Sequence, residues 1–378
     1  MPLKVLNLTS TPRGIGGVES LLLTAVDKYD ARRFEVSFSN LFDAGGEDSV
    51  FAGELHARGA RYIDVPGAGW RALPRIVAEL VRVMRRERFD VVHTHMLHAT
   101  IIGQMAARLA GVPVRIVSRQ YMGDEAHHNK GAAVRAVDTY ATRTATHVIA
   151  NSEAVREILI RGYDVAPERV TVVHNSVDIA AIDAARLTAP LPWDDSRDGQ
   201  LLLGYVASLT PRKDHENLFR AFARVLEAEP RARLVLVGEG PERTRLEALA
   251  SELSISRDVV FAGYRDDVAA VVRHFDLYVH PPRHEAFGIA VAEALALSRP
   301  VVATAVGGIP EVVGEEAGVL VAPGDPEALA SAILRVLRDP ELRARLGHSG
   351  RRRVEERFDI QVTVDRYQDV YSRFAGRA

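Results

Sequence analysis

The chain has 378 residues, 48 of them basic and 50 acidic, so two domains are expected and the formal charge is −2. This near-neutral balance gives no electrostatic case for nucleic acid, and the absence of cysteine excludes disulfides, thiolate metal sites and cysteine nucleophiles. No apolar run approaches the roughly 18–20 residues of a membrane span, and the first residues lack a signal-peptide pattern, so we expect a cytoplasmic protein.

The first half of the chain alternates short apolar segments with longer segments of helical pattern. The expected strands are residues 4–9, 34–40, 61–65, 90–94, 114–118, 147–150 and 169–174. The expected helices are residues 21–29, 49–58, 72–88, 99–110, 130–144 and 153–161. Because many of these strands are apolar throughout, the pattern predicts an α/β fold with a parallel sheet and helices on both faces. Ligands bind such sheets beyond the carboxyl ends of the strands.

A glycine-rich turn follows the first strand. Gly14, Gly16 and Gly17 separate that strand from the next helix, and Glu19 follows them. Backbone N–H groups in such a turn can cradle an anion. The spacing differs from the dinucleotide-binding fingerprint, and a tight turn that needs positive φ is an equally good interpretation.

Three histidines, His93, His95 and His98, cluster at the end of the strand 90–94. Imidazoles in this position can ligate zinc, but no carboxylate lies near them in sequence. We favour the interpretation that one of these histidines reaches a ligand bound beyond the strand end. His95 lies nearest that end. His93 is also compatible with a structural role.

The helix between Trp70 and Phe89 has one basic and one apolar face. The basic face runs from Arg71 to Arg88, and leucine, isoleucine and valine occupy the other. A core-facing helix with a solvated basic side is the simple interpretation. The alternative is peripheral contact with anionic lipid on the inner membrane face, or with a phosphorylated acceptor.

Residues 179–199 change in composition toward Ala, Asp and Pro, and we interpret them as a linker between a first domain, 1–178, and a second, 200–361. The second domain resumes the alternation, with expected strands at 201–207, 233–237, 258–262, 277–280, 301–304 and 318–321. A terminal helix at about 362–378 is expected to pack back on the first domain.

The most informative stretch joins the strand 277–280 to a helix at 289–297. Its turn carries Glu285, and Glu293 lies on the helix. The amides of Phe287, Gly288 and Ile289 would lie at the helix N-terminus, where unpaired N–H groups favour an anion. Two carboxylates beside such amides suit a ligand that has both hydroxyls and phosphate.

Adjacent cations follow the first strand of the second half. Arg212 and Lys213 lie at its carboxyl end. A solvated basic turn is one interpretation, and a clamp on a leaving diphosphate is the other.

These motifs occur in one order along the chain and together resemble the retaining GT-B glycosyltransferases of glycosyltransferase family four. The resemblance runs from Lys4 to about Phe374. The matching segments are Gly16-Gly17-Val18-Glu19, Asn175-Ser176-Val177-Asp178, Lys213, Gly238-Glu239-Gly240-Pro241, Glu285-Ala286-Phe287-Gly288 with Glu293, and Gly307-Gly308-Ile309-Pro310-Glu311.

The resemblance implies a GT-B fold, two Rossmann-like domains facing across a cleft, with the donor held mainly by the second. It also implies transfer of a sugar from a nucleoside diphosphate sugar to a hydroxyl acceptor, with retention and without a required metal or cofactor. A UDP-sugar is the expected donor and a GDP-sugar the alternative. The acceptor, whether saccharide, lipid-linked or small molecule, is not given by the sequence.

The resemblance also assigns roles to single residues. Glu285 would contact the sugar hydroxyls, Glu293 the ribose, and Lys213 with Arg212 the diphosphate. His95 would lie beside the donor sugar. The further donor-binding residues are expected to be Gly16, Gly17, Ser208, Gly238, Tyr264, Arg265, Phe287, Gly288 and Ile289. The residues expected at the acceptor are Glu19, Arg119 and Tyr121.

One departure concerns Ala207-Ser208-Leu209, where the family often has Gly-Arg-Leu. We hypothesise that Arg212 replaces the missing arginine. The alternatives on the same fold are a nucleotide-sugar epimerase, a phosphorylase and a non-catalytic nucleotide-sugar binding protein, with an NAD-dependent oxidoreductase the weakest.

Overall fold

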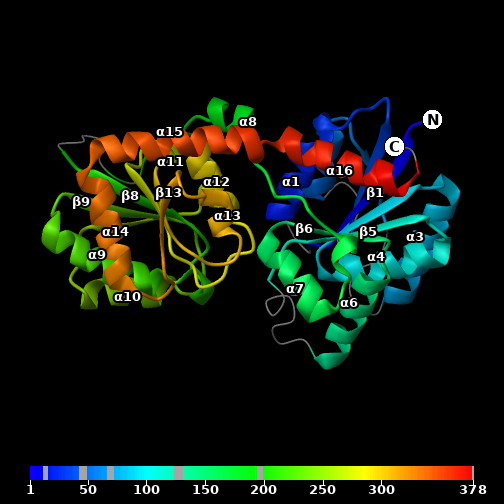
Figure 1. Ribbon diagram of the computed structural model, residues 1–378, viewed down its shortest axis with the longest axis horizontal. Helices are drawn as coiled ribbons and strands as arrows, with labels where there is room; N and C mark the ends of the chain where they lie inside the picture. Colours follow the sequence, from blue (N-terminus) through cyan, green and yellow to red (C-terminus); the bar gives the residue numbers. More distant parts are fainter. Residues whose placement is uncertain are drawn as a thin grey trace. The chain divides into compact units, whose positions relative to one another are not determined.

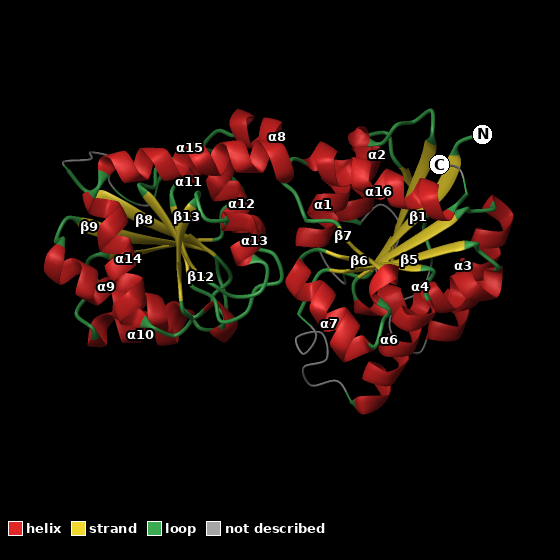
Figure 2. Ribbon diagram, in the orientation of Figure 1, coloured by secondary structure: helices red, strands yellow, loops and turns green. Residues whose placement is uncertain are grey.

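The computed structural model describes residues 1–11, 16–41, 49–65, 72–122, 131–191, 193 and 199–376. The chain divides into two compact units. The first comprises Met1–Ser176 and Ile360–Ala378, and the second Val177–Asp359. Each unit is a parallel sheet covered by helices on both faces, so the predicted pair of parallel α/β sheets is confirmed (Figures 1 and 2).

The sheet of the first unit has seven strands in the order β3-β2-β1-β4-β5-β6-β7, and all neighbours are parallel. The strands are β1 (Leu3–Thr9), β2 (Phe34–Asn40), β3 (Arg61–Tyr62), β4 (Val91–His95), β5 (Val114–Arg119), β6 (His147–Ala150) and β7 (Val170–Val172). Strand order reverses between β1 and β4. In open α/β sheets, such a reversal leaves a crevice at the carboxyl ends of the two strands, where ligands bind.

Two helical layers cover this sheet. The helices are α1 (Gly17–Ala25), α2 (Val50–Ala57), α3 (Leu73–Glu87), α4 (Leu97–Ala110), α6 (Ala132–Thr144), α7 (Glu153–Tyr163) and α16 (Ile360–Phe374). Helix α4 packs against α3 and α6 on one face, whereas α1 packs against α2 and α16 on the other (Figure 1). Tyr367 and Tyr371 of α16 are buried against Val5 and Val91 of the sheet, which attaches the end of the chain to this unit.

The sheet of the second unit has six parallel strands in the order β10-β9-β8-β11-β12-β13. They are β8 (Leu201–Val206), β9 (Ala232–Val237), β10 (Val259–Gly263), β11 (Leu277–His280), β12 (Val301–Thr304) and β13 (Gly318–Val321). Strand order reverses here between β8 and β11. The loops that follow β8 and β11 contain Lys213 and Glu285, so both residues leave the sheet at this reversal.

The helices of the second unit enclose two hydrophobic cores. They are α8 (Ile179–Ala184), α9 (His215–Ala228), α10 (Arg243–Glu252), α11 (Val268–Val272), α12 (Ile289–Ala296), α13 (Ile309–Val313), α14 (Pro326–Arg338) and α15 (Pro340–Arg357). Phe222 of α9 and Ile333 of α14 belong to one core, and Leu295 of α12 and Val354 of α15 to the other. All four side chains are completely buried, so each helix contributes its apolar face to the unit.

Part of the segment expected as a linker forms helix α8. The Asp178 carboxylate caps this helix by accepting from the Ala181 amide at 2.9 Å. Asp183 at its other end forms an ion pair with Arg351 of α15 at 2.8 Å. The ion pair with Arg351 attaches α8 to the second unit, to which residues from Val177 onward belong.

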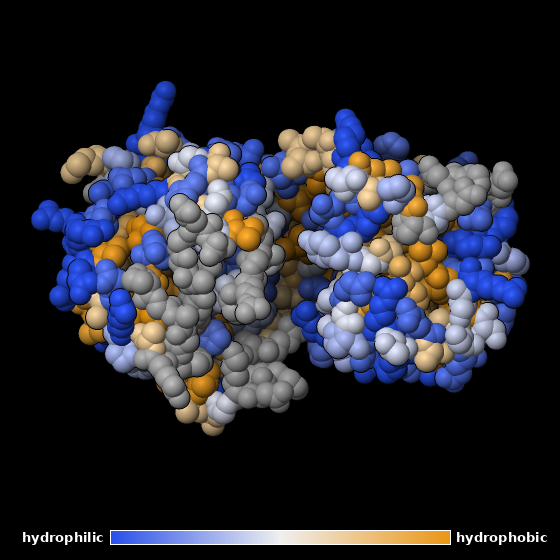
Figure 3. All heavy atoms as spheres, turned by 180° about the vertical axis from the view of Figure 1, so that it is seen from behind, coloured by the Kyte–Doolittle hydropathy of each residue, from blue (hydrophilic) through white to orange (hydrophobic). Residues whose placement is uncertain are grey.

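The surface seen from behind is mostly hydrophilic, with smaller hydrophobic areas between the charged groups (Figure 3). Within the described part of the chain, no helix has both the length and the apolar character needed to cross a bilayer.

Candidate active site

Four loops interlock at the carboxyl edge of the second sheet. Gly238, after β9, has φ 137°, and a Cβ there would lie 2.1 Å from the carbonyl oxygen of Ala207, after β8. Gly307, after β12, has φ 52°, and a Cβ there would lie 1.7 Å from the carbonyl oxygen of Glu285, after β11. Only glycine permits these approaches. The glycine motifs therefore hold the loops that carry the functional groups.

Glu285 is the centre of this edge. Its Oε2 atom lies 2.5 Å from Nζ of Lys213 and accepts from Nε2 of His280 at 3.3 Å. The side chains of Lys213 and Glu285 are 12% and 14% exposed, so the pair is screened from bulk water without being sealed. Burial raises the carboxyl pKa, but the His280 hydrogen bond and the Lys213 charge outweigh it, and the pKa lies well below its usual value. Glu285 is therefore ionised at neutral pH.

A second ion pair joins the turns that carry Lys213 and Glu285. Arg283 approaches the buried Asp214 carboxylate through Nε at 3.0 Å and Nη2 at 3.1 Å, and its backbone N–H donates to Arg212 at 3.0 Å. Tyr205 donates its hydroxyl to the Lys213 carbonyl at 2.8 Å. Sequence reasoning missed these positioning groups, although Arg283 and Asp214 each lie within two residues of a predicted site residue.

Helix α12 begins beside Glu285. Its N-cap residue, Gly288, has φ 99°, a left-handed conformation that glycine adopts readily. The first N–H groups of a helix have no partner within it, which makes this end suitable for an anion. The Phe287 side chain is buried against Phe358, so what this residue can offer a ligand is its backbone.

Glu293 lies on α12 with limited access to solvent. Burial raises the pKa of its carboxyl to about 7. A carboxyl in this state is poised between its neutral and ionised forms at physiological pH. A ligand hydroxyl that donates to it would favour the ionised form.

The other expected donor residues of the second unit differ in exposure. Ser208 and Arg212 are exposed, and Tyr264 is 80% exposed. Arg265 instead forms an ion pair with Asp267 at 2.6 Å and donates to the carbonyl groups of Ala189 and Pro190. The guanidinium of Arg265 thus attaches the segment that contains Ala189 and Pro190 to this unit. A donor-binding role for Arg265 stays a prediction.

In the first unit, Glu19 holds the glycine turn closed. Its carboxylate accepts from the hydroxyl groups of Thr9 and Thr11 and from the Gly16 amide, the last at 3.2 Å. The side chain is 1% exposed, while Gly17 is exposed at the start of α1. The predicted acceptor role of Glu19 is untested, and the contacts seen here are structural. Gly14 lies outside the described residues.

Both strand histidines of the first unit are fully buried. His93 lies 2.7 Å from Tyr371 Oη and 2.7 Å from Ser118 Oγ, so it has partners for both ring nitrogens. His95 Nε2 lies 3.1 Å from Asn7 Oδ1, and its Nδ1 has no partner among the described residues. Burial lowers the His95 pKa to about 3, so this imidazole is neutral.

Arg119 belongs to a buried ionic cluster. Its guanidinium makes two contacts with the Asp138 carboxylate, at 3.1 and 3.2 Å, and also contacts Tyr121 and Thr142. Tyr163 donates to the same carboxylate at 3.1 Å. Arg119 and Asp138 are 1% and 0% exposed. Arg119, which was predicted at the acceptor, therefore uses its guanidinium in contacts with α6 and α7 in the structure.

The basic face expected between Arg71 and Arg88 lies on α3, although Arg71 is outside the described residues. Arg82 pairs with Glu79, and Arg86 with Glu87 at 3.0 Å. These neighbouring carboxylates neutralise part of the basic face.

Comparisons with known proteins identify the family of the chain. Residues 194–353 match the family model Glycosyl transferases group 1, and residues 15–181 match Glycosyltransferase Family 4. A D-inositol 3-phosphate glycosyltransferase of Saccharomonospora viridis is 31% identical over 323 residues, covering 76% of this chain and 72% of that protein. The chain belongs to glycosyltransferase family four. It is therefore a glycosyltransferase, and the predicted family and enzyme class are confirmed.

Two further similar proteins extend the comparison. A 2-deoxystreptamine glucosyltransferase of Streptomyces kanamyceticus is 28% identical, covering 84% of this chain and 86% of that protein. The crystal structure of Anabaena HepE in complex with UDP-glucose shares the fold, with a TM-score of 0.82 and 23% identity over 98% of this chain and all of that one.

Proposed function

We propose that this glycosyltransferase moves a sugar, with retention of anomeric configuration, from a nucleoside diphosphate sugar to a hydroxyl of its acceptor. The observation that carries the proposal is the Lys213–Glu285 pair beside the N-terminus of α12. This arrangement supplies a cation and the N-terminus of a helix for a diphosphate, and a carboxylate for sugar hydroxyls.

In this proposal Lys213 stabilises the leaving group. As the glycosidic bond to the diphosphate breaks, negative charge develops on the phosphate oxygens. A preorganised ammonium group and a helix N-terminus lower the barrier because they are already oriented toward that charge. Arg212, exposed one residue away, would add a second cation.

Glu285 has two tasks in this proposal. Its charge orients Lys213 before the donor arrives, and its carboxylate accepts from hydroxyls of the bound sugar. His280, held neutral because burial lowers its pKa, donates from the strand and keeps the carboxylate in place. We assign no side-chain nucleophile. The acceptor hydroxyl would attack on the face that the diphosphate leaves, and its proton would pass to the departing diphosphate.

Glu293 would bind the ribose of the donor. A pair of ribose hydroxyls can donate to one carboxylate, and this requires the ionised form of Glu293. The UDP-glucose complex of HepE supports a UDP-sugar as the donor, with a GDP-sugar as the alternative.

The test is a panel of UDP, GDP, ADP and TDP with their sugars, scored by thermal stabilisation and then by transfer. A ligand at 100 times its dissociation constant should stabilise the fold by about 2.7 kcal/mol. One nucleotide should shift the midpoint, and Glu293→Ala should reduce that shift. Glu247→Ala, which removes an exposed carboxylate on α10, is the matched control. A panel without any shift in the wild type would contradict the proposal.

A further inference from the structure

Helix α6 of the first unit separates two concavities. One is a hollow of about 810 Å³ between α6 and the segment that joins α7 to β7. The other is a groove of about 530 Å³ between α6 and α4. Tyr140 and Thr144 line both, so the two concavities meet along one ridge of the helix.

The groove between α4 and α6 is apolar and open to solvent. Met105 and Leu109 of α4 and Val137 and Tyr140 of α6 line it, and they are 43%, 57%, 49% and 60% exposed. Eight large hydrophobic residues are this exposed in the described part of the chain, and half of them lie at this groove. Single exposed hydrophobic residues scattered over a surface are normal, whereas a cluster of them is typical of a binding face.

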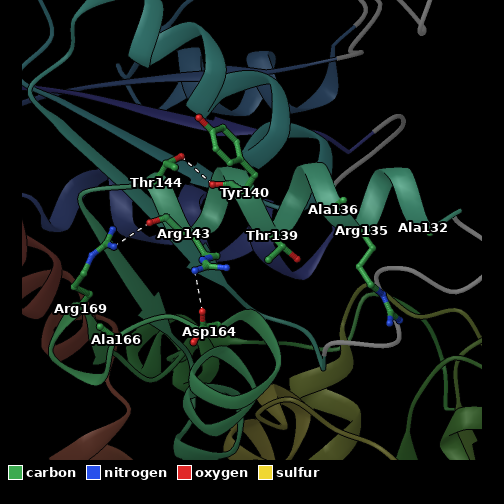
Figure 4. Close-up of a pocket in the computed structure, with 10 residues that line it drawn as sticks. All are labelled: Ala132, Arg135, Ala136, Thr139, Tyr140, Arg143, Thr144, Asp164, Ala166 and Arg169. Atoms are coloured by element: carbon green, nitrogen blue, oxygen red, sulfur yellow. Dashed lines mark hydrogen bonds and ion pairs between the residues drawn. The ribbon is translucent and has the colours of Figure 1, made fainter.

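The hollow on the other side of α6 is cationic. Arg143 extends from the helix toward Asp164, Arg135 extends from the helix nearer its start, and Tyr140 points away from Asp164 (Figure 4). Arg169 also lines the hollow and donates to the Arg143 carbonyl at 2.9 Å. Asp164, paired with Arg143 at 2.8 Å, is the one acidic residue among the described residues that line it.

The two concavities together carry more positive charge than the protein as a whole. Among the described residues that line the two concavities, four arginines and one aspartate give a formal charge of +3, in a chain whose net charge is −2. An apolar slot beside a cationic hollow matches a surface on which hydrocarbon and phosphate lie side by side. A protein or peptide partner would have to present an apolar group and an anionic group at the same spacing as the slot and the hollow.

We propose that this face, formed by α4, α6 and the α7–β7 segment, docks on a bilayer of anionic phospholipid. Met105, Leu109, Val137 and Tyr140 enter the interfacial region, while Arg108, Arg135, Arg143 and Arg169 meet the lipid phosphates. Tyr140, at the ridge between the concavities, has the amphipathic ring that favours the membrane–water boundary. This proposal is independent of the donor chemistry described above.

The test uses the full chain and sedimentation with vesicles of phosphatidylcholine, with and without phosphatidylglycerol. Wild-type protein should sediment with the anionic vesicles, less so at high salt, and weakly with the neutral ones. Arg135→Gln with Arg143→Gln should weaken binding by roughly 25-fold, because each cation near an anionic surface contributes about fivefold. Val137→Asp with Tyr140→Asp should abolish it.

Matched controls on other surfaces separate the proposed face from general effects. Val50→Asp changes a residue that is 58% exposed on α2, and Arg352→Gln changes an exposed arginine of α15. Both should bind vesicles as the wild type does. Val137→Ser with Tyr140→Ser is the milder variant if the aspartates disturb folding, and an unchanged thermal midpoint establishes that it folds.

Several results would overturn the proposal. Equal binding to neutral vesicles would remove the role of the arginines, and full binding by the α6 variants would place the contact elsewhere. Concentration-dependent self-association that the same variants abolish, without vesicle binding, would identify a second copy of the chain as the occupant.

Discussion

The carboxyl edges of the two sheets share a topology but use their polar side chains differently. In the first unit, Glu19 and Arg119 are buried, and neighbouring groups occupy both carboxylate oxygens of Glu19 and both terminal nitrogens of Arg119. In the second, Lys213, Glu285 and Glu293 keep partial access to solvent. A polar residue at a strand end is therefore weak evidence for a site. The stronger evidence is a charged group that still has capacity to bind after its neighbours are counted.

The largest effect is expected from Arg119→Ala in the first unit. This change leaves the Asp138 carboxylate buried without its cation, and breaking a buried pair from one side typically costs about 3–5 kcal/mol. Urea unfolding measures the loss. Arg352→Ala is the control, because its pair with Glu316 spans 3.8 Å at the surface and should contribute almost nothing. A loss of less than 1 kcal/mol for Arg119→Ala would show that the cluster is not a structural one.

Glu285→Gln should separate function from stability in the second unit. We expect kcat/KM to fall by roughly 10²–10³-fold, equivalent to about 3–4 kcal/mol, because the amide neither balances Lys213 nor accepts hydroxyls as a carboxylate does. The unfolding midpoint should change little, since both side chains retain some access to water. Transfer assays on this variant and on Glu247→Gln test the difference, and wild-type turnover would remove the central role of Glu285.

Glu293 should make the second unit sensitive to pH. Its folded-state pKa of about 7 lies above the ordinary value, so the folded protein holds this proton more tightly than the unfolded chain. Stability should consequently fall as pH rises toward 7, by at most about 3 kcal/mol, since one pKa unit corresponds to about 1.4 kcal/mol. Glu293→Gln should then be more stable than the wild type at pH 8 and similar to it at pH 4.

Glu293 should affect donor binding with the opposite pH dependence, so that affinity rises with pH where stability falls. If ribose hydroxyls donate to the ionised carboxylate, wild-type affinity for the nucleotide rises as pH passes through 7, and Glu293→Gln removes that rise. Calorimetric titration at pH 6 and pH 8 measures both. A pH-independent affinity in the wild type would contradict the assignment of Glu293 to the ribose.

The smallest of these effects is expected for Arg212→Ala. If Arg212 compensates for the arginine absent at Ser208, kcat/KM should fall by several tens-fold, or about 2 kcal/mol. Arg220→Ala, on the exposed side of α9, is the control. An unchanged rate would mean that Lys213 and the α12 amides carry the phosphate charge without Arg212.

Most of the fold could be predicted from local pattern. The strands of both sheets are short and largely apolar, and the structure places each of them within a few residues of its expected position. Strand 61–65 is shorter than expected, because only Arg61 and Tyr62 pair with β2. Helix α8 was not expected, since its start depends on the Asp178 cap and its end on a contact of Asp183 with the distant Arg351.

The order of the motifs along the chain determined the family and enzyme class, and it pointed to Lys213, Glu285 and Glu293. The partners of these residues came only from the tertiary structure. Lys213 meets Glu285 across 72 residues of sequence, and Arg283 meets Asp214 across 69. Burial, which gives Glu293 its raised pKa and closes Glu19 and Arg119 to solvent, depends in the same way on packing. Local pattern reports the conformation that a segment prefers, whereas charge state and access depend on groups that only folding brings together.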